Sequence, residues 1–475
     1  MMSRHHQDVD PLDAVLRPPP DETNEQRALR IASEEHAKAV SEEIDAAIRA
    51  EQQRRKKRVV KLLLLGQSES GKSTTLRQFQ RIYTPTAFRE ERVLWRAVIQ
   101  LNIVRSIRTI LDAIYLAIGS YSPPAPHLLT QSIAQAQKPL IARLQPIREL
   151  ESFLIAKLVP PNEDEPTSLT GAELSSSSGD GQTSSWRSQE VFVRGVTGWR
   201  SVLDNARLNQ QAHGSNVYSV ESVDECQQVL YRCRADIAAL WGDAKVRDVL
   251  KRKKVRLEEG PGFFLNDLRR VTSLKYSPSD DDVLKARLKT VGVSEYKFEM
   301  EVAAGRDAGT EWRIIDVGGS RSQVSRAWVP FFEDVDAIVF LAPISAFDQV
   351  LSEDRTVNRL EDSVLLWKAV CSNKLLANVE LVLFLNKCDI LDTKLKSGIR
   401  LAKYVRTYGE RENDLESVTK YLKGKFSAIH REYSPNPRKF YVFATSVTDT
   451  TTTGGIIASV RDIVVRRHLS QSKLL

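Results

Sequence analysis

A pattern typical of a buried strand runs directly into a glycine-rich loop near the start of the chain. Residues Val59–Gly66 read VVKLLLLG, a continuous apolar run of the kind found in parallel sheets covered on both faces. The residues from Gly66 to Ser73 fit G-x-x-x-x-G-K-S, and the residues after them have the spacing of a helix. A strand, this loop and a helix in that order predict a cradle for phosphate, in which backbone N–H groups at a helix N-terminus face the anion.

Strands and helices alternate in the last part of the chain. After about Val283, segments rich in Val, Ile, Leu and Phe are separated by long stretches with helical spacing. The expected strands are 311–319, 337–343, 379–389 and 439–446. This alternation predicts an α/β fold with a parallel-rich sheet flanked by helices on both faces.

The part between these two regions has a different pattern. From about Phe88 to Asp282 the apolar residues recur at helical spacing, so an all-helical part is expected there. The insert 159–190 is crowded with Ser, Gly, Asp and Pro, a composition that cannot offset the entropy of ordering, and disorder is expected. The expected domain division is therefore 58–87 with 283–475, and 88–282 between them.

The N-terminal region is strongly polar. Residues 1–22 are rich in Pro and charge and are expected to be a disordered tail. Residues 23–57 contain no Gly or Pro and are expected to form an amphipathic helix, either a solvated arm or a docking surface for a partner. The helix ends in a basic run of Arg54, Arg55, Lys56, Lys57 and Arg58. This run is either a solvated helix end or a contact with a membrane surface of anionic lipid headgroups.

Composition excludes several classes of protein. The 475 residues are 41% hydrophobic and 27% charged, which is ordinary for a globular chain with more than one domain. No apolar run approaches the roughly 20 residues of a membrane span, and the start has no apolar core of a secretory signal. Four cysteines give no disulfide framework, so a reducing compartment is expected. The net charge of +8 is modest, and no nucleic-acid partner is expected.

A second motif indicates which base accompanies the phosphate. The segment LFLNKCD places Asn386, Lys387 and Asp389 at the end of an apolar strand. A carboxylate can accept hydrogen bonds from N1–H and the exocyclic amine of guanine, whereas adenine offers no such pair of donors, so an ATPase or kinase is disfavoured. A third motif, IIDVGG, places Asp316 at a strand end for a magnesium site, and Gly319 could donate its N–H to a γ-phosphate.

The motifs GQSESGKST, DVLKARLKT, DVGGSR, LFLNKCD and TSVTDT follow one another along the chain. In content and order they resemble the α subunits of heterotrimeric G proteins, from about Arg54 to the C-terminus apart from 159–190, and 340–351 resembles fungal members. The resemblance implies a Ras-like P-loop GTPase domain with an inserted all-helical domain and an N-terminal helix. It also implies a GDP/GTP switch, a seven-helix G protein-coupled receptor, a βγ dimer and an effector.

The resemblance implies the site residue by residue. The residues expected to bind the nucleotide are Glu69, Ser70, Gly71, Lys72, Ser73, Thr74, Glu259, Gly260, Leu284, Lys285, Ala286, Arg287, Thr290, Asp316, Gly319, Asn386, Lys387, Asp389 and Val447. Mg²⁺ is expected on Ser73 and Thr290, with Asp316 acting through water. Arg287 is expected to be the built-in arginine that stabilises the transition state.

Two positions depart from the family, and both concern hydrolysis. Ser320 stands where the family has the Gln that orients the attacking water, and Ser68 replaces a Gly beside the γ-phosphate. Slow GTP hydrolysis is therefore expected, with Arg287 and Ser320 at the catalytic centre, unless Gln323 supplies the contact with water. Two hypotheses stay open: a switch that hydrolyses GTP slowly, and a GTP-locked signalling subunit with essentially no hydrolysis.

A further departure concerns attachment to the membrane. The family usually has Gly after the initiator Met, whereas Met2 and Ser3 follow here, so no N-myristoylation is expected. A cytoplasmic location is expected, at the inner face of the plasma membrane through the βγ dimer or the basic run 54–58.

Overall fold

The computed structural model describes most of the chain. The described residues are 22–56, 59–119, 138–158, 192–193, 224–290, 293–301, 310–318, 335–351 and 354–471. The chain divides into two compact units, 1–58 and 59–475. The expectations of disorder for 1–22 and 159–190 fall, apart from Glu22, outside the described residues.

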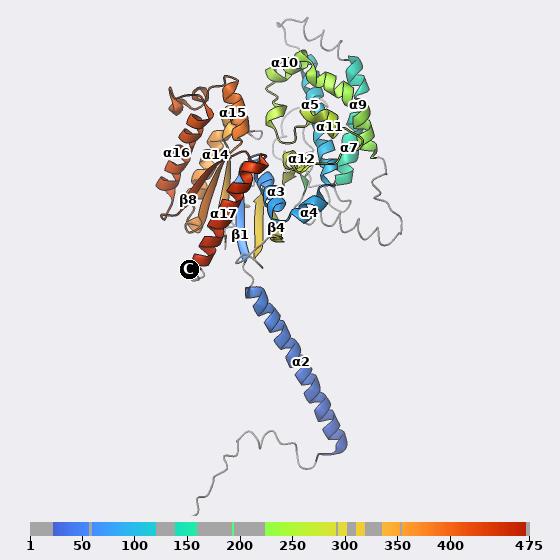
Figure 1. The fold of residues 1–475 in the computed structure, drawn as a ribbon, viewed down its shortest axis with the longest axis vertical. Coiled ribbons are helices and arrows are strands. Elements are labelled where there is room, and N and C mark those ends of the chain that lie inside the picture. The colour runs from blue at the N-terminus through green and yellow to red at the C-terminus, as the bar shows by residue number, and fades with distance from the viewer. Residues whose placement is uncertain are drawn as a thin grey trace, which may run out of the picture. The chain divides into compact units, whose positions relative to one another are not determined.

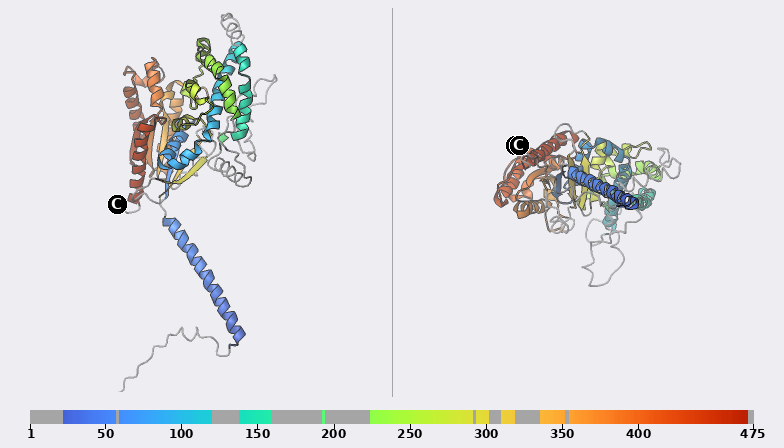
Figure 2. Two further views of the ribbon diagram at one scale, coloured as in Figure 1. Left: turned by 45° about the vertical axis from the view of Figure 1, so that its right-hand side comes forward. Right: turned by 90° about the horizontal axis from the view of Figure 1, so that it is seen from below.

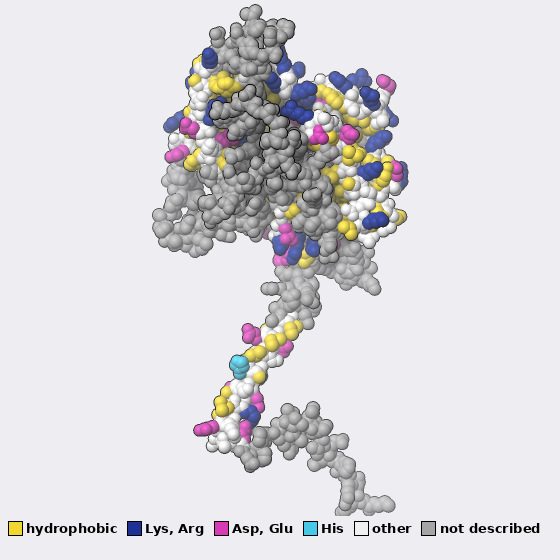
Figure 3. Space-filling view, turned by 180° about the vertical axis from the view of Figure 1, so that it is seen from behind, with side chains coloured by type: hydrophobic (Ala, Val, Ile, Leu, Met, Phe, Trp, Pro, Cys, Tyr) yellow, Lys and Arg dark blue, Asp and Glu magenta, His cyan; other side chains and the backbone are white. Residues whose placement is uncertain are grey.

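The first unit contains the long helix α2 (Asn24–Lys56), drawn in blue in Figure 1. Its sequence is rich in Ala, Glu, Gln and Arg, which are strong helix formers. Figure 3 shows apolar side chains, in yellow, along this helix. The exposed large apolar side chains of the helix are Leu29, Ile31, Val40, Ile44 and Ile48. The last three are spaced by four residues and share one face of the helix. The side chains of the basic run 54–58 lie outside the described residues.

The second unit is built on a six-stranded sheet with the order β4-β5-β1-β6-β7-β8. Its strands are β4 (Val293–Glu299), β5 (Glu311–Val317), β1 (Val59–Gly66), β6 (Ala337–Pro343), β7 (Glu380–Asn386) and β8 (Phe440–Thr445). Every neighbouring pair is parallel except β4 and β5, which are antiparallel. The parallel strands therefore end at one edge of the sheet, where ligand sites of such folds lie.

Helices cover both faces of this sheet (Figures 1 and 2). On β1, Val60, Leu62 and Leu64 pack with α3 (Lys72–Tyr83) and α17 (Thr450–Gln471). Leu63 and Leu65 point to the other face. The helices that pack there are α14 (Arg359–Ser372), α15 (Cys388–Lys396) and α16 (Leu415–Tyr433). The continuous apolar sequence of the strand is explained by this burial on two sides.

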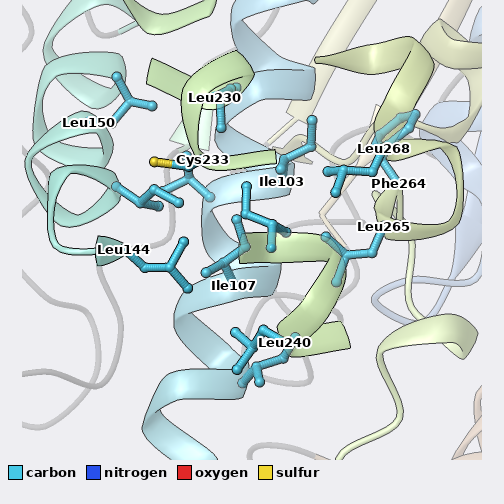
Figure 4. Packing of buried hydrophobic residues seen from close by; sticks show 14 of the residues in the cluster. Ile103, Ile107, Leu144, Leu150, Leu230, Cys233, Leu240, Phe264, Leu265 and Leu268 are labelled. Atoms are coloured by element: carbon cyan, nitrogen blue, oxygen red, sulfur yellow. The ribbon is translucent and has the colours of Figure 1, made fainter. Parts of the chain in front are cut away.

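A separate apolar core lies mainly among helices (Figure 4). The helices around it are α5 (Trp95–Gly119), α7 (Pro146–Leu158), α9 (Glu225–Gly242), α10 (Ala244–Arg252) and α11 (Leu268–Val271). Helix α5 contributes Ile103 and Ile107, which face Leu144 and Leu230 in Figure 4. Its apolar residues lie almost all around it because neighbours surround it.

Short elements connect these parts. They are α4 (Pro85–Glu91), η1 (Leu257–Glu259), η2 (Leu265–Asp267), α12 (Asp280–Lys285), η5 (Ile344–Asp348), η6 (Lys374–Leu376), η7 (Leu401–Lys403) and η8 (Arg406–Tyr408). Two short strands, β2 (Phe192–Val193) and β3 (Lys289–Thr290), pair in parallel with each other. Within the described residues, no helix is long and apolar enough to cross a bilayer. All four cysteines are free, and three of them are buried.

Strand β4 was not predicted from the sequence. Its alternate residues Glu295, Lys297 and Glu299 are polar and at least partly exposed, so the segment lacks the apolar run by which the other strands were predicted. As an edge strand, β4 needs burial on one face only, and pairing with β5 supplies its hydrogen bonds.

His430 of α16 is expected to make stability depend on pH. Its ring stacks 4.6 Å from Phe440 and 6.5 Å from Trp367. Burial lowers the pKa of His430 below 6.5, and the positive charge of Arg438 adds a smaller shift in the same direction. The unfolded chain then binds the proton more readily, so stability is full above the ordinary pKa and decreases as the pH falls below it.

The urea midpoint should therefore drop between about pH 7.5 and about pH 5.5. In His430→Gln, which carries no titrating ring, the drop should be smaller. Equal drops in the two proteins would show that other groups cause the dependence.

Candidate nucleotide-binding site

Space and backbone geometry require glycine at two positions of the phosphate loop. Gly66 and Gly71 have φ of 142° and 107°, which residues with a side chain rarely adopt. A Cβ on Gly71 would lie 2.4 Å from Nδ2 of Asn386. One on Gly66 would lie 2.4 Å from the carbonyl oxygen of Leu341. The loop therefore passes close to the ends of β6 and β7.

Lys72 reaches back across this loop. Its Nζ donates to the carbonyl oxygens of Gly66 at 2.8 Å and Gln67 at 2.7 Å. Burial lowers the pKa of Lys72 to about 8, although the negative charge of Asp316 acts in the opposite direction. A phosphate at the loop would add negative charge and favour the ammonium form further.

The first turn of α3 also faces the loop. Gly71 is its N-cap, and no side chain in the described part of the protein caps the helix. The N–H groups of a first helical turn point toward the N-terminal end of the helix, and the helix dipole adds partial positive charge there. The predicted residues that lie in the loop or this turn are Glu69, Ser70, Gly71, Lys72, Ser73 and Thr74. This is an arrangement that binds phosphate.

Two of the groups expected at Mg²⁺ lie together. The Oγ of Ser73 donates to Oδ2 of Asp316, at the end of β5, over 2.6 Å. Hydroxyl and carboxylate oxygens are ligands that Mg²⁺ prefers, so this donor set fits the ion. Thr290 lies in β3, and its side chain is outside the described residues. No cluster of three or more His, Cys, Asp or Glu that could hold a metal occurs among the described residues.

Asn386 connects the phosphate loop with the loop after β8. Its Nδ2 donates to the carbonyl oxygen of Ser70 at 2.7 Å. Its Oδ1 accepts from Oγ1 of Thr445 at 3.1 Å and from the backbone N–H of Val447 at 3.2 Å. Since this side chain is fully buried, the three segments are held in one arrangement.

Asp389 and Lys387 lie next to this connection. The hydroxyl of Ser446 donates to Oδ1 of Asp389 at 3.0 Å and accepts from the backbone N–H of Asp389 at 3.0 Å. Lys387 has φ of 67° at the start of α15. Burial lowers the pKa of Lys387 to about 8, and the negative charge of Glu69 in the phosphate loop opposes this shift.

Arg287 reaches the phosphate loop from the helical side. Its guanidinium pairs with Glu69 over 2.7 Å, and Arg359 pairs with the same carboxylate over 3.3 Å. Burial alone would raise the pKa of Glu69, but the charges of Arg287 and Arg359 bring it below 4.5. Arg359 also donates to the carbonyl oxygen of Ser68 at 2.7 Å.

The segment before Arg287 is fixed to α3. Nη1 of Arg77 donates to the carbonyl oxygens of Val283 at 2.7 Å and Ala286 at 2.8 Å. The guanidinium of Arg77 also lies 4.2 Å from the ring centroid of Trp95. The predicted residues at the end of α12 and just after it are Leu284, Lys285 and Ala286.

Glu259 takes part in a buried charge network. Its carboxylate pairs with Lys394 over 2.7 Å and accepts from Nε2 of Gln349 at 2.6 Å. Lys394 also pairs with Asp348 over 2.6 Å, and Asp348 pairs with Arg256. The side chains of Asp348 and Lys394 are 0% and 4% exposed. The network joins η1 on the helical side to η5 and α15 on the sheet side.

Several expectations fall outside the described residues. They concern Gly319, Ser320 and Gln323. Gly260 is described and lies directly after Glu259, where its N–H donates to the carbonyl oxygen of Leu257 at 3.1 Å.

Residues of this region that were not predicted from the sequence include Arg77, Gln78, Asn102 and Arg359. Gln78 donates to the carbonyl oxygen of Val447 at 2.9 Å, and Asn102 contacts the backbone of Arg287. A signal was available for Asn102, since it is a polar residue inside the apolar stretch AVIQLNIV.

Comparisons with known proteins agree with this geometry. A sequence model described as the G-protein alpha subunit matches residues 38–464. The guanine nucleotide-binding protein alpha-4 subunit of Mycosarcoma maydis is 29% identical, over 98% of this chain and 96% of the relative. The alpha-2 subunit of Neurospora crassa is 29% identical over 91% and 95%. The alpha-3 subunit of Caenorhabditis elegans is 36% identical over 49% and 63%.

Two of these relatives are fungal, as the resemblance of 340–351 indicated. The match to the family covers most of the chain, including the phosphate loop, the Asn386–Asp389 motif and the helical part between them. The chain therefore belongs to the G-protein alpha subunit family, which combines a Ras-like GTPase domain with a helical domain.

Proposed function

We propose that this α subunit binds GDP and GTP with Mg²⁺ and acts as a switch between a seven-helix receptor and an effector. The GTPase domain comprises 58–87 and 283–475, and the helical domain comprises 88–282. The phosphates bind at Glu69 to Thr74, and guanine binds between Lys387, Asp389 and Val447. Ser73 and Thr290 hold Mg²⁺, which supplies charge compensation for the phosphates when bound.

The observation that best supports this proposal is the position of Asn386. Its buried amide bonds to Ser70 in the phosphate loop and to Val447 in the loop beside Asp389. A ligand with phosphates at one end and a guanine at the other would contact both loops at once. One side chain therefore fixes the relation between the two halves of the binding site.

GTP hydrolysis by this chain is proposed to be slow. Arg287 lies close enough to Glu69 of the phosphate loop to place its charge near a γ-phosphate. Ser320 is too short to orient the attacking water as the Gln of the family does. Ser68 adds a side chain where the family has none. Binding residues are retained, while the step that positions water is weakened.

The second candidate function is a GTP-locked signalling subunit. Ser68 and Ser320 favour it because both changes act on the same step. Signal output would then depend on nucleotide exchange and occupancy. Single-turnover hydrolysis separates the two functions, because the locked subunit keeps its bound GTP.

Partners are proposed from the family and from α2. The exposed apolar face with Val40, Ile44 and Ile48 provides a surface for a βγ dimer. The basic run 54–58 is proposed to add attraction to anionic lipids, so that the protein acts at the cytoplasmic face of the plasma membrane.

Restoring the family residues should restore hydrolysis. We expect Ser320→Gln to raise the single-turnover rate at least ~10-fold, equal to roughly 1.4 kcal/mol of the barrier. The double variant Ser68→Gly/Ser320→Gln should raise it further, because the added glutamine gains room beside the γ-phosphate. The rate is measured on protein preloaded with radiolabelled GTP and started with Mg²⁺.

Binding of GTPγS in the same samples is the control, and its affinity should stay within about threefold. A wild-type rate equal to that of the double variant would contradict the impaired hydrolysis. Absence of guanine nucleotide binding by the wild type would contradict the proposed function itself.

A further inference from the structure

The backbone of Arg287 is bound on both sides by one side chain. Oδ1 of Asn102 accepts from the backbone N–H of Arg287 at 2.7 Å, and Nδ2 donates to the carbonyl oxygen of Arg287 at 2.9 Å. Asn102 lies on α5, whose residues form the helical core, and is only 6% exposed. The amide thus pairs with Arg287 as a neighbouring strand would.

This pairing explains why the residue at position 102 is asparagine. Residues 286–288 belong to no helix or strand, so their backbone groups need partners from elsewhere. An amide side chain offers one acceptor and one donor, which matches the N–H and C=O of Arg287. Aspartate could only accept, and leucine could do neither.

Gly262 packs against Asn102 and Arg287. Gly262 has φ of 80°, and its N–H donates to the carbonyl oxygen of Lys285 at 2.9 Å. A Cβ there would lie 2.6 Å from Oδ1 of Asn102 and 2.8 Å from Cβ of Arg287. The backbone of Gly262 therefore packs directly on the pair and leaves it little room to move.

These contacts come from the helical side, whereas the guanidinium of Arg287 reaches the phosphate loop through Glu69. We infer that Asn102 is a positioning residue for GTP hydrolysis, which sets where Arg287 places its charge by fixing the backbone of that residue. The inference rests on the proposed function, because it gives the helical domain a part in the chemistry of the proposed GTPase. Asn102 itself does not touch the nucleotide in this assignment.

The expected effect follows from the sensitivity of catalysis to distance. A displacement of about 1 Å in a catalytic group can cost ~100-fold in rate. Loss of the amide contacts should therefore slow single-turnover hydrolysis between about 10-fold and 100-fold. Because the phosphate loop and the guanine contacts proposed above lie on other segments, affinity for GTPγS should change less than about threefold.

The test uses the full chain carrying Ser320→Gln as the parent, so that hydrolysis is fast enough to measure. Asn102→Leu removes both contacts, and Asn102→Asp keeps the acceptor but removes the donor. Gln100→Leu is the matched control, since Gln100 is fully buried on the same helix. It bonds to Asp224 at 2.7 Å and Gln227 at 2.9 Å, away from Arg287.

A second set of variants asks whether Asn102 acts through Arg287. In the Arg287→Ala background, neither Asn102 variant should slow hydrolysis further, because residues that act as a unit are not additive. Hydrogen exchange gives a readout that is independent of catalysis. With GDP bound, the amide of Arg287 should lose protection in Asn102→Leu and keep it in Gln100→Leu.

The expected result is slower hydrolysis with retained GTPγS binding in both Asn102 variants, and neither change in Gln100→Leu. If Asn102→Leu does not fold, Asn102→Asp decides the matter. Rates equal to the parent, or further slowing in the Arg287→Ala background, would overturn the inference while the proposed function stands. The inference would also be overturned if Arg287→Ala hydrolysed GTP as fast as the parent. A parent that binds no guanine nucleotide would overturn both, and the binding measurement identifies that case.

Discussion

Replacing Asp389 with Asn should reverse the base preference of the protein from guanine to xanthine. In the proposed site the Asp389 carboxylate accepts from N1–H and the exocyclic amine of guanine. Hydrogen bonds to a charged group contribute roughly 1.5–3 kcal/mol each. In Asp389→Asn the uncharged amide oxygen can still accept from N1–H, but the amide N–H₂ faces the exocyclic amine. Loss of one of these bonds and weakening of the other correspond to a decrease of about 10²- to 10³-fold in GTP affinity.

Xanthine carries a carbonyl oxygen where guanine has its exocyclic amine. The amide of Asn can donate to that oxygen, so affinity for XTP should rise as affinity for GTP falls. Ser446 supports the exchange, because its hydroxyl can hold an amide oxygen at the place where it now holds Oδ1 of Asp389. The ratio of the two affinities is therefore the most informative quantity.

Titration with fluorescent GTP and XTP analogues measures this ratio. Asp392→Asn is the matched control, since Asp392 lies on the same helix and pairs with Lys396 at the surface over 2.6 Å. The control should leave both affinities within about threefold, because an exposed ion pair contributes little. An Asp389→Asn protein that still prefers GTP would remove Asp389 from the guanine site.

The parallel part of the fold could be predicted because its strands carry a strong local signal. Buried strands such as β1 and β6 need apolar residues on both faces, and this requirement is visible in a single sequence. The phosphate loop could be predicted for a similar reason, since glycine at 66 and 71 is dictated by backbone angles within the loop itself. Local requirements leave a pattern in the sequence at fixed spacing.

Contacts between distant segments could not be predicted in this way. Asn102 and Arg287 are 185 residues apart, and Arg256 and Asp348 are 92 apart. No spacing rule connects such positions, because they meet only in the folded structure. Strand β4 was missed for a related reason: the hydrogen bonds to β5 define it, rather than an apolar run of its own.

Asp348→Ala is expected to accelerate release of GDP by about 100-fold. The side chain of Asp348 is fully buried and holds Lys394 and Arg256 in the network that joins the helical side to the sheet side. Removing one partner of a buried pair leaves uncompensated charge, at a cost of about 3 kcal/mol or more. Lys394 and Arg256 would both remain near Glu259, with one carboxylate left for two cations.

This loss of free energy destabilises the closed arrangement of the site. The phosphate loop is covered by Arg287 from the helical side, and α15, which follows Lys387, is held by Glu259 of η1. A nucleotide bound between these segments leaves when their contacts break. If the closed form loses about 3 kcal/mol of stability and the open form loses none, the site opens ~100-fold more frequently.

Release of a fluorescent GDP analogue, chased with excess GDP, measures this rate. Asp236→Ala is the control, because the Asp236–Arg143 pair is exposed and lies within the helical part; its release rate should be unchanged. Asp348→Leu/Lys394→Met removes both charges and should release GDP more slowly than Asp348→Ala, since a neutral pair leaves no buried cation beside Arg256. If Asp348→Ala releases GDP at the wild-type rate, the network does not hold the site closed, and other contacts such as the Arg287–Glu69 pair would have to do so.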